Sequence, residues 1–534
     1  MAATDLDERS AAALRPGRPQ TVILIAIWLI AALPFLIVSL PPVMDVPNHL
    51  TRIWLLAGGI DHAPLSTMYE ARWSQASTNI FVDLLGVGLA RVMSIAAVGK
   101  LLLLAMFFGP PLAALRLHKK LFGHTGWWAL AGIALVWSTT AVTGLISYQI
   151  GLAVALLLAS ALHPLGTSPR NLVLVVAATA TTLIIHPFGA LFFLLLLVGL
   201  EMGPKVPPRA EWMALARRIG MITLASLIPV VLLVLFAPHP PSAHGTHQEF
   251  MHWLEWKTMF APDTIALVLF SPIVAYKASL DMALVLPLLA VIAWAAYRRR
   301  LQVHAGLLLV AAALEIVSPL LPMNIGDGGA LVIRFPEMAA LMALAAIRPT
   351  FSSRAKAAVF AGVLAFTALA RIATMGWIWQ SRDADLAQLQ AVSRALPAGA
   401  SVLLLQQHWS ETGSTPLGKL IAGFPSGRCS SERHYASLLV MWRQVFIPSL
   451  FTVPGQQPLA VKPAYQDKAV YSTGIPFIGD MNTASRRQLD PYLDHWQQKY
   501  DYVLLLNADL GHTPLPGTRI IANQGFARLY KVQR

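Results

Sequence analysis

The feature that most constrains this chain is a series of long apolar segments without charged side chains. The first runs from Thr21 to Leu40, and about 20 apolar residues are enough for a helix to cross a bilayer. Only 12% of the 534 residues are charged and 56% are hydrophobic, whereas a soluble domain carries roughly 25% charged residues. The sequence therefore predicts a mostly α, integral membrane protein.

Further segments with few or no charges follow along the chain. They cover residues 101–115, 126–162, 171–200, 219–238, 282–297, 305–323, 335–347 and 357–370. The segment 126–162 is long enough for two crossings, with a hinge near Gly144 to Gln149. The pattern predicts a polytopic transmembrane helical bundle with about eleven crossings.

Basic residues indicate which loops face the cytoplasm, because Lys and Arg concentrate in cytoplasmic loops. The polar tail of residues 1–20 contains three arginines, which predicts a cytoplasmic N-terminus. No small-residue cleavage site follows the first apolar segment, so we expect a retained anchor rather than a signal peptide. Three later loops are predicted to be cytoplasmic, and their basic residues are Lys205, Arg209, Arg217 and Arg218; Arg298, Arg299 and Arg300; and Arg348, Arg354 and Lys356.

Two arrangements of the early segments fit the sequence. In the first, residues 79–96 cross the membrane despite two charges, and residues 171–201 form one kinked crossing. In the second, residues 79–96 lie along the membrane interface, and residues 171–201 break at His186-Pro187 into two short crossings. The second arrangement obeys the positive-inside rule better. Both arrangements give eleven crossings and an external C-terminus.

The composition changes after about residue 377, where charges become frequent and no further segment can span a membrane. A helix is expected over residues 381–396 and buried strands over residues 401–406 and 500–507. The predicted parts are a cytoplasmic tail of residues 1–20, a transmembrane bundle of residues 21–376 with external loops 41–78 and 239–281, and an extracytoplasmic α/β domain of residues 377–534.

A cluster of polar side chains follows the first crossing directly, on the predicted external side. It contains Asp45, Asn48, His49 and Arg52. A carboxylate that is partly desolvated at the mouth of a membrane bundle has a raised pKa, which suits it to general-base work. The alternative is a capped helix start, in which Asp45 or Asn48 accepts hydrogen bonds from backbone N–H groups. Spacing alone favours the helix cap.

A second cluster joins two predicted crossings on the same side. It contains Asp327 and Arg334, and an arginine at the start of a crossing can hold a phosphate through paired hydrogen bonds. The alternative is a flexible turn followed by an arginine that extends to the lipid headgroups. Glu315 lies within a crossing, where a carboxyl is costly in lipid, so we expect it to face the bundle interior.

The external loop of residues 239–281 contains an apolar piece, residues 264–275, that is too short to span. We expect this piece to lie at the interface and to cover a lipid tail. The loop also carries several histidines without fixed spacing, which indicates a polar loop rather than a metal site. These histidines are His239, His244, His247 and His252.

Motifs for several other functions are absent from the sequence. It has no zinc signature of paired Cys and His ligands, no GxxxxGK[ST] loop and no GxSxG elbow. The net charge of +14 is explained by basic cytoplasmic loops rather than by nucleic-acid binding. We therefore expect no nucleic-acid partner and no cofactor, with a divalent metal as the less favoured alternative.

The order of these features resembles the GT-C superfamily of integral-membrane glycosyltransferases, of the protein-mannosyltransferase, aminoarabinose-transferase and oligosaccharyltransferase kind. The stretch Asp45–Arg52 resembles the acidic motif in the first external loop of that superfamily. The runs Leu89–Ser94 and Lys120–Gly123 resemble parts of its second and third crossings. The resemblance covers about residues 20–375. Many members have two adjacent acidic residues in the first loop, whereas this chain has one, which argues against a metal site.

The resemblance implies a sugar donor carried on a polyprenyl phosphate and an envelope lipid, polysaccharide or protein as acceptor. Asp45 would take the proton from the acceptor hydroxyl, and Arg334, with Arg52 or Lys277, would stabilise the departing phosphate. Membrane lipids would surround the bundle, most simply in a bacterial inner membrane. The expected substrate-binding residues are Asn48, His49, Arg52, Lys277, Asp327 and Arg334.

Two other classes of function remain open from the sequence. A transporter or flippase for a lipid or polymer would use charged groups within the membrane, such as Glu315. A non-catalytic membrane subunit would bind partners through the C-terminal domain. The sequence shows no inverted repeat, and an external domain of this size is unusual for a transporter, so a glycosyltransferase is the favoured function.

Overall fold

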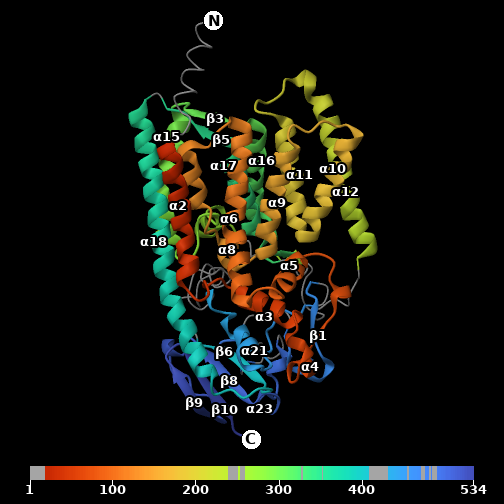
Figure 1. Ribbon diagram of the computed structural model, residues 1–534, viewed down its shortest axis with the longest axis vertical. Coiled ribbons are helices and arrows are strands. Elements are labelled where there is room, and N and C mark those ends of the chain that lie inside the picture. The colour runs from red at the N-terminus through yellow and green to blue at the C-terminus, as the bar shows by residue number, and fades with distance from the viewer. Residues whose placement is uncertain are drawn as a thin grey trace.

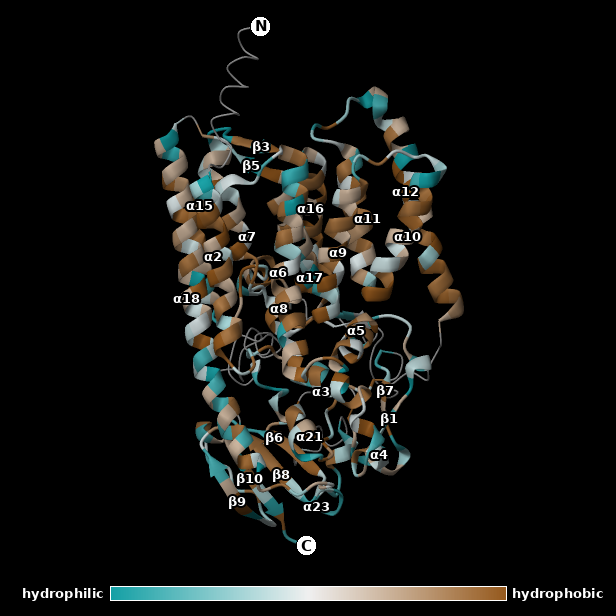
Figure 2. Cartoon of the chain, in the orientation of Figure 1, coloured by the Kyte–Doolittle hydropathy of each residue, from teal (hydrophilic) through white to brown (hydrophobic). Residues whose placement is uncertain are grey.

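A helical bundle forms one part of the molecule and a small sheet domain forms the other (Figure 1). Most long helices run along the longest axis, and the C-terminal sheet lies at the end opposite the start of the first helix. Hydrophobic residues dominate the bundle, and hydrophilic residues gather at its ends and in the sheet domain (Figure 2). The computed structural model describes residues 18–237, 251–252, 259–325, 329–351, 353–407, 431–453, 456–470, 475–479, 481, 483 and 490–534.

Five helical segments in the described part of the chain are long and apolar enough to cross a membrane. These helices expose large apolar side chains, such as Leu29 and Phe236, which are 65% and 79% exposed. Such exposure of large apolar groups fits a bilayer and not water. The protein is therefore an integral membrane protein. The five segments are α2 (Arg18–Ile37), α6 (Ile95–Phe122), α12 (Trp212–Phe236) with the turn before it, α15 (Ala278–Tyr297) and α18 (Arg354–Ser393).

Shorter apolar helices complete the bundle. Two of them are separated at His186-Pro187, where the second predicted arrangement has a break. The chain separates α10 from α11 at His186, whose Nδ1 accepts the Phe188 N–H at 3.1 Å and so starts the second helix. The predicted crossing or interfacial segment of residues 79–96 contains the ten-residue α5 and the first two residues of α6. The number of crossings stays a prediction. The shorter helices are α5 (Phe81–Ala90), α9 (Ile146–Leu162), α10 (Pro169–Ile185), α11 (Pro187–Met202), α16 (Ala305–Val317) and α17 (Leu331–Ala346).

The region predicted as two crossings over residues 126–162 is irregular in its first half. It consists of α7 (Ala131–Ala134) after a 3₁₀ turn, then α8 (Thr139–Thr143), then α9. The chain turns at Gly144, inside the predicted hinge, with φ of +92°. A side chain there would meet the backbone nitrogen of Asp45 at 3.0 Å. Glycine is therefore required both by the backbone conformation and by the close approach of the loop that follows α2.

The loop of residues 41–78, which is predicted to be external, folds against the C-terminal part of the chain. It contains α3 (Val46–Leu56), α4 (Leu65–Met68) and β1 (Tyr69–Ala71). Strand β1 pairs antiparallel with β7 (Leu459–Val461), and α3 packs against α21 (Leu438–Arg443). Segments nearly 400 positions apart thus share one hydrophobic core.

The C-terminal domain contains a four-stranded sheet in the order β6-β8-β10-β9. The strands predicted at 401–406 and 500–507 are present as β6 (Val402–Gln406) and β8 (Tyr502–Leu506), which pair in parallel. Strand β10 (Ala527–Val532) pairs antiparallel with both β8 and β9 (Thr518–Gln524). The helix predicted over 381–396 is the last part of α18, a 40-residue helix that continues from the bundle to Ser393. The predicted boundary at residue 377 therefore falls inside a helix.

A buried ion pair connects α15, α18 and the irregular segment before α8. Arg371 donates from Nη1 to Asp281 Oδ1 at 3.1 Å and from Nη2 to the Trp137 carbonyl at 2.8 Å. The second carboxylate oxygen of Asp281 accepts the backbone N–H groups of Ala275 and Lys277. Both charged side chains are at most 1% exposed. Each charge depends on the other, because an unpaired buried charge is strongly destabilising.

We predict that Arg371→Leu lowers the stability of the detergent-solubilised protein by about 3–5 kcal/mol, since it leaves the Asp281 carboxylate buried without its cation. Thermal unfolding followed by tryptophan fluorescence measures the change. The double variant Arg371→Leu/Asp281→Asn should recover part of the loss, because the remaining buried group is then neutral. Arg534→Gln is the matched control: its partner is Asp501, both side chains are largely exposed, and the change should stay within about 1 kcal/mol. Equal losses in both arms would contradict the prediction.

Candidate functional site

Asp45 lies at the start of α3, in the loop that follows α2. Its backbone N–H donates to the Thr143 carbonyl at 3.0 Å, which holds the loop against the Gly144 turn. The carboxylate makes no capping hydrogen bond to α3. The oxygen of Asn48 accepts the backbone N–H of Phe451 instead of a helix N–H. Neither Asp45 nor Asn48 therefore caps α3 with its side chain, although spacing favoured that alternative.

The Asp45 carboxyl is buried among cationic and polar groups. Its side chain is 15% exposed, and its Oδ1 lies 3.5 Å from Nε2 of His434. Burial raises the pKa of Asp45 from 3.8 to about 7, although the positive charges of Arg433, Arg52 and Arg334 each act in the opposite direction. A carboxyl with this pKa is close to half-ionised at neutral pH, as a general base requires.

Arg334 lies in the first turn of α17. Its positive charge acts electrostatically on Asp45 from the bundle side. Its guanidinium donates twice to the Gly329 carbonyl, at 3.2 and 3.0 Å, and Nη1 lies 3.1 Å from Nε2 of His186. The guanidinium also lies over the rings of Tyr148 and Phe188, about 5 Å from each centroid. Among the described residues no carboxylate pairs with it. The charge of Arg334 is therefore open to an anionic ligand.

Arg52 has a partner that the sequence did not predict. It donates from Nε and Nη2 to both carboxylate oxygens of Asp83 in α5, at 2.8 and 3.0 Å. Both side chains are at most 2% exposed. A bidentate buried pair of this kind fixes α5 against α3. The proposed contact of Arg52 with a substrate phosphate stays a prediction, and it competes with Asp83.

Asn48 connects α3 to the C-terminal domain and is 0% exposed. Its Nδ2 donates to the Ser449 carbonyl at 3.2 Å and lies 3.0 Å from Nδ1 of His434, while its Oδ1 accepts from Phe451 at 2.9 Å. All three contacts are made to residues of one C-terminal segment. The side chain is therefore saturated by protein, which favours a structural part in the site.

His49 lies one residue further along α3, beside Arg52. Nη2 of Arg52 is 3.1 Å from Nδ1 of His49, and the imidazole meets the ring of Phe451 edge-on. Burial and the charge of Arg52 lower the pKa of His49 well below its ordinary value. The ring is therefore neutral at physiological pH.

Lys277, another predicted binding residue, lies against α18. Lys277 precedes α15, and its amine lies 4.9 Å above the ring of Trp377 in α18. Its contacts in the described part of the chain are with α15 and α18 rather than with Asp45 or Arg334. Asp327 lies outside the described residues, as do His239, His244 and His247 of the histidine-rich loop. Among the described residues, no three His, Cys, Asp or Glu side chains lie together as metal ligands would.

Sequence reasoning missed the contribution of the C-terminal domain to this cluster. His434 and Arg433 both face Asp45, yet they are nearly 400 positions away in the chain. Tyr148, which donates to the Arg334 carbonyl at 2.6 Å, was also missed. The one sequence signal is a charged run at residues 432–434, just before the apolar stretch of residues 435–442. That run does not indicate its partner.

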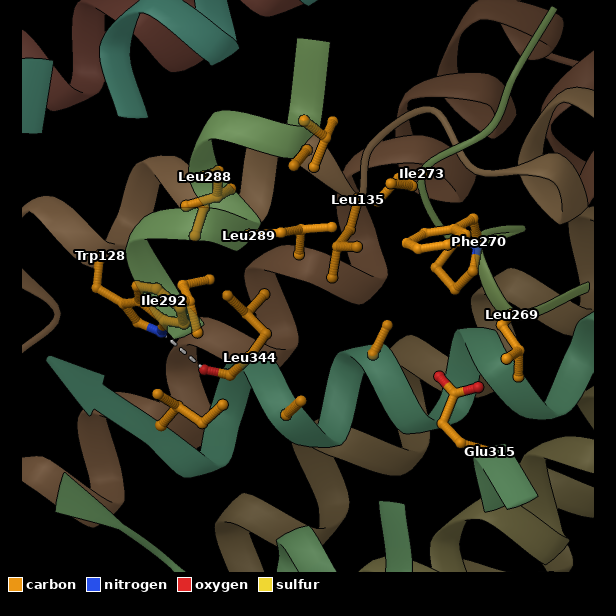
Figure 3. Close-up of a pocket in the computed structure, with 17 residues that line it drawn as sticks. Trp128, Leu135, Leu269, Phe270, Ile273, Leu288, Leu289, Ile292, Glu315 and Leu344 are labelled. Atoms are coloured by element: carbon orange, nitrogen blue, oxygen red, sulfur yellow. Dashed lines mark hydrogen bonds between the residues drawn. The ribbon is translucent and has the colours of Figure 1, made fainter. Parts of the chain in front are cut away.

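A cavity of about 320 Å³ opens between α7, α14, α15 and α17, where α14 is Pro262–Leu269. Its lining is apolar except for Glu315, which points into it from α16 (Figure 3). Residues 269–273, from the predicted interfacial piece, form one wall together with Leu288 and Leu289. The Trp128 indole donates to the Leu344 carbonyl at 2.9 Å at the other end. This shape and lining suit an aliphatic chain.

The architecture described above is a GT-C-like membrane fold. A search of solved structures finds the crystal structure of ArnT from Cupriavidus metallidurans in the apo state, with a TM-score of 0.51 over 96% of this chain and 97% of that chain. The two sequences are 11% identical, so the likeness concerns the fold. No protein-family model and no curated protein sequence matches the chain. The GT-C-like fold that the sequence resemblance implied is confirmed, while the particular subfamily stays a prediction.

We predict that Asn48→Ala lowers the stability of the protein by about 1–3 kcal/mol, because it leaves the Phe451 N–H and the Ser449 carbonyl buried without this partner. The measurement is the thermal midpoint in detergent, combined with limited proteolysis of the C-terminal domain. Gln75→Ala is the control, since it removes one partly buried hydrogen bond, to the Gln457 carbonyl, in the same contact region. The prediction fails if the two variants unfold at the same temperature.

Proposed function

We propose that this protein is a GT-C-type membrane glycosyltransferase that transfers a sugar from a polyprenyl phosphate to an envelope acceptor on the extracytoplasmic side. The acceptor would be the hydroxyl of a lipid, polysaccharide or protein. Asp45 is the general base, and Arg334 binds the phosphate. The proposal places the chain in a bacterial inner membrane with the C-terminal domain outside.

The observation that carries this proposal is a buried carboxyl, Asp45, within electrostatic reach of Arg334. Asp45 is a buried carboxyl with a pKa of about 7, and Arg334 acts on it electrostatically. A base poised near neutral pH beside an arginine without a carboxylate partner supplies the two groups that displacement of a phosphate needs. The ArnT-like fold supports the same class of chemistry.

The proposed reaction is a single displacement. Asp45 accepts the proton of the acceptor hydroxyl, whose oxygen forms a bond to the anomeric carbon of the sugar. The bond between that carbon and the phosphate oxygen breaks, and its electron pair leaves with the polyprenyl phosphate. Arg334 stabilises the charge that develops on the leaving phosphate. Asp45 then releases its proton to solvent.

The apolar cavity beside α14 is the proposed place for the first part of the lipid tail. Its lining includes the predicted interfacial piece, and its walls are formed by membrane helices. The tail would move there from the equally apolar bilayer, so the hydrophobic effect adds little and the packing of the cavity walls would hold the tail. The cavity would thus orient the donor through its lipid, whatever sugar that lipid carries.

We predict that Asp45→Asn lowers transfer by a factor of about 10² to 10⁴, because the amide cannot accept the proton. The measurement is mass spectrometry of envelope glycans in cells that depend on the plasmid-borne protein. Asn has nearly the same size as Asp, so the thermal midpoint should stay close to that of the unaltered protein. Arg334→Gln should also lower transfer, through weaker donor use.

Glu315→Gln is the discriminating control for this prediction. Glu315 lines the lipid cavity, and it is the group that a lipid or polymer transporter would need. Under the proposed function its neutral analogue keeps transfer within a few-fold. If glycans are unchanged in the Asp45 variant while Glu315→Gln abolishes function, the protein is a transporter and the proposal is wrong.

The pH dependence of transfer follows from the raised pKa of Asp45. The base works in its ionised form, so kcat/KM should rise with pH through about pH 7 and level off above it. Below that pH the slope should approach a tenfold change per unit. Membrane vesicles supplied with their own lipid-linked sugars allow the measurement. Asp383→Asn is the control, because that carboxylate holds Ser39 and its loss should leave the midpoint of the profile in place.

A further inference from the structure

The orientation of the Asn48 side chain is determined by its own hydrogen bonds. Its Oδ1 accepts the Phe451 N–H at 2.9 Å, and its Nδ2 donates to the Ser449 carbonyl at 3.2 Å. A flipped amide would place a donor against a donor and an acceptor against an acceptor. The group that faces Nδ1 of His434 at 3.0 Å is therefore the amide nitrogen of Asn48.

This orientation determines which nitrogen of His434 carries the proton. Because the Asn48 amide donates to Nδ1, the neutral imidazole holds its hydrogen on Nε2. Nε2 is the atom that lies 3.5 Å from Oδ1 of Asp45. The edge-on contact with the ring of Phe451 keeps the imidazole in place. Burial and the charge of Arg433 lower the pKa of His434 to about 3, so the ring stays neutral across the physiological range.

We propose that His434, in the C-terminal domain, is a positioning residue for Asp45, held in the active tautomer by Asn48. Its Nε2–H stabilises the ionised carboxylate and holds Oδ1, which leaves the other oxygen for the acceptor hydroxyl. This inference rests on the proposed function of Asp45 as base. The contact of 3.5 Å is long for a hydrogen bond, as is common before substrate binds.

Several other charges face Asp45 and must be accounted for. They are Arg52 from α3, Arg334 from α17 and Arg433 from the segment before α21. All three are arginines, a side chain that carries a permanent positive charge in proteins. His49 lies nearby on α3 and is neutral. A change at His434 alone therefore alters the protonation of Asp45 through the lost N–H.

The test reads the protonation of Asp45 directly, without any transfer reaction. The full-length protein in lipid nanodiscs is treated with dicyclohexylcarbodiimide, which reacts with protonated carboxyl groups, and the Asp45 peptide is quantified by mass spectrometry from pH 5 to 9. Labelling of the unaltered protein should fall with a midpoint near pH 7. His434→Asn keeps a polar group near Asn48 but removes the N–H that faces Asp45. It should raise the labelling midpoint by about half a pH unit or more. His434→Gln extends an amide N–H to Asp45 and should keep the midpoint close to 7.

Thr51→Val is the matched control for the contact between α3 and the C-terminal domain. It removes the hydrogen bond from Thr51 to the Ser437 carbonyl, on the same helix and against the same segment, without touching Asp45. Its midpoint should be unchanged. If His434→Asn and His434→Gln both titrate like the unaltered protein, the positioning proposal is overturned. The same holds if Thr51→Val shifts the midpoint as much as His434→Asn, because the effect is then one of domain contact.

The outcome is separable from that of the proposed function. If Asp45→Asn abolishes transfer but substitutions at His434 do not shift the labelling midpoint, the role of Asp45 as base is supported and only the positioning role of His434 fails. If Asp45→Asn leaves transfer intact, the proposed function fails, and with it the positioning role. Support for both requires the midpoint shift together with an equal shift in the acidic limb of kcat/KM in His434→Asn, which a merely structural role of His434 would not produce.

Discussion

The buried amide of Asn48 is the interaction on which the arrangement of this site depends. Three hydrogen bonds connect it to one C-terminal segment, and none of its polar atoms meets water. Because a buried amide without partners is costly, the loop that follows α2 is held against that segment. This contact places Asp45 between the bundle and the C-terminal domain, so both parts of the chain contribute charges to one carboxyl.

Buried charges in this protein fall into two groups with different physical meaning. Arg52 with Asp83, and Arg371 with Asp281, are paired at hydrogen-bond distance and connect helices. Asp45 and Arg334 are also buried, but neither has an ionic partner of that quality among the described residues. Holding such groups in a folded protein costs stability, which is why imperfectly compensated charges mark functional sites. The presence or absence of a close ionic partner distinguishes these two groups of charges better than their position near the membrane does.

Much of the fold was predictable because its causes are local in the sequence. Apolar length predicted the membrane helices, Pro187 predicted a helix break, and short apolar runs predicted β6 and β8. The boundary expected at residue 377 falls inside α18, which continues to Ser393. A change of composition along the chain does not require a loop, so one helix can extend across it.

The sequence by itself determined that this is an integral membrane protein and singled out Asp45 as the carboxyl to test. Each of these follows from hydropathy and from charge near the ends of apolar segments. Only the tertiary structure decided which charges are paired, giving Asp83 to Arg52 and leaving Arg334 to act on Asp45. It also brought His434 to that carboxyl. Pairing across nearly 400 residues depends on how helices and sheet pack together, and no local pattern encodes it.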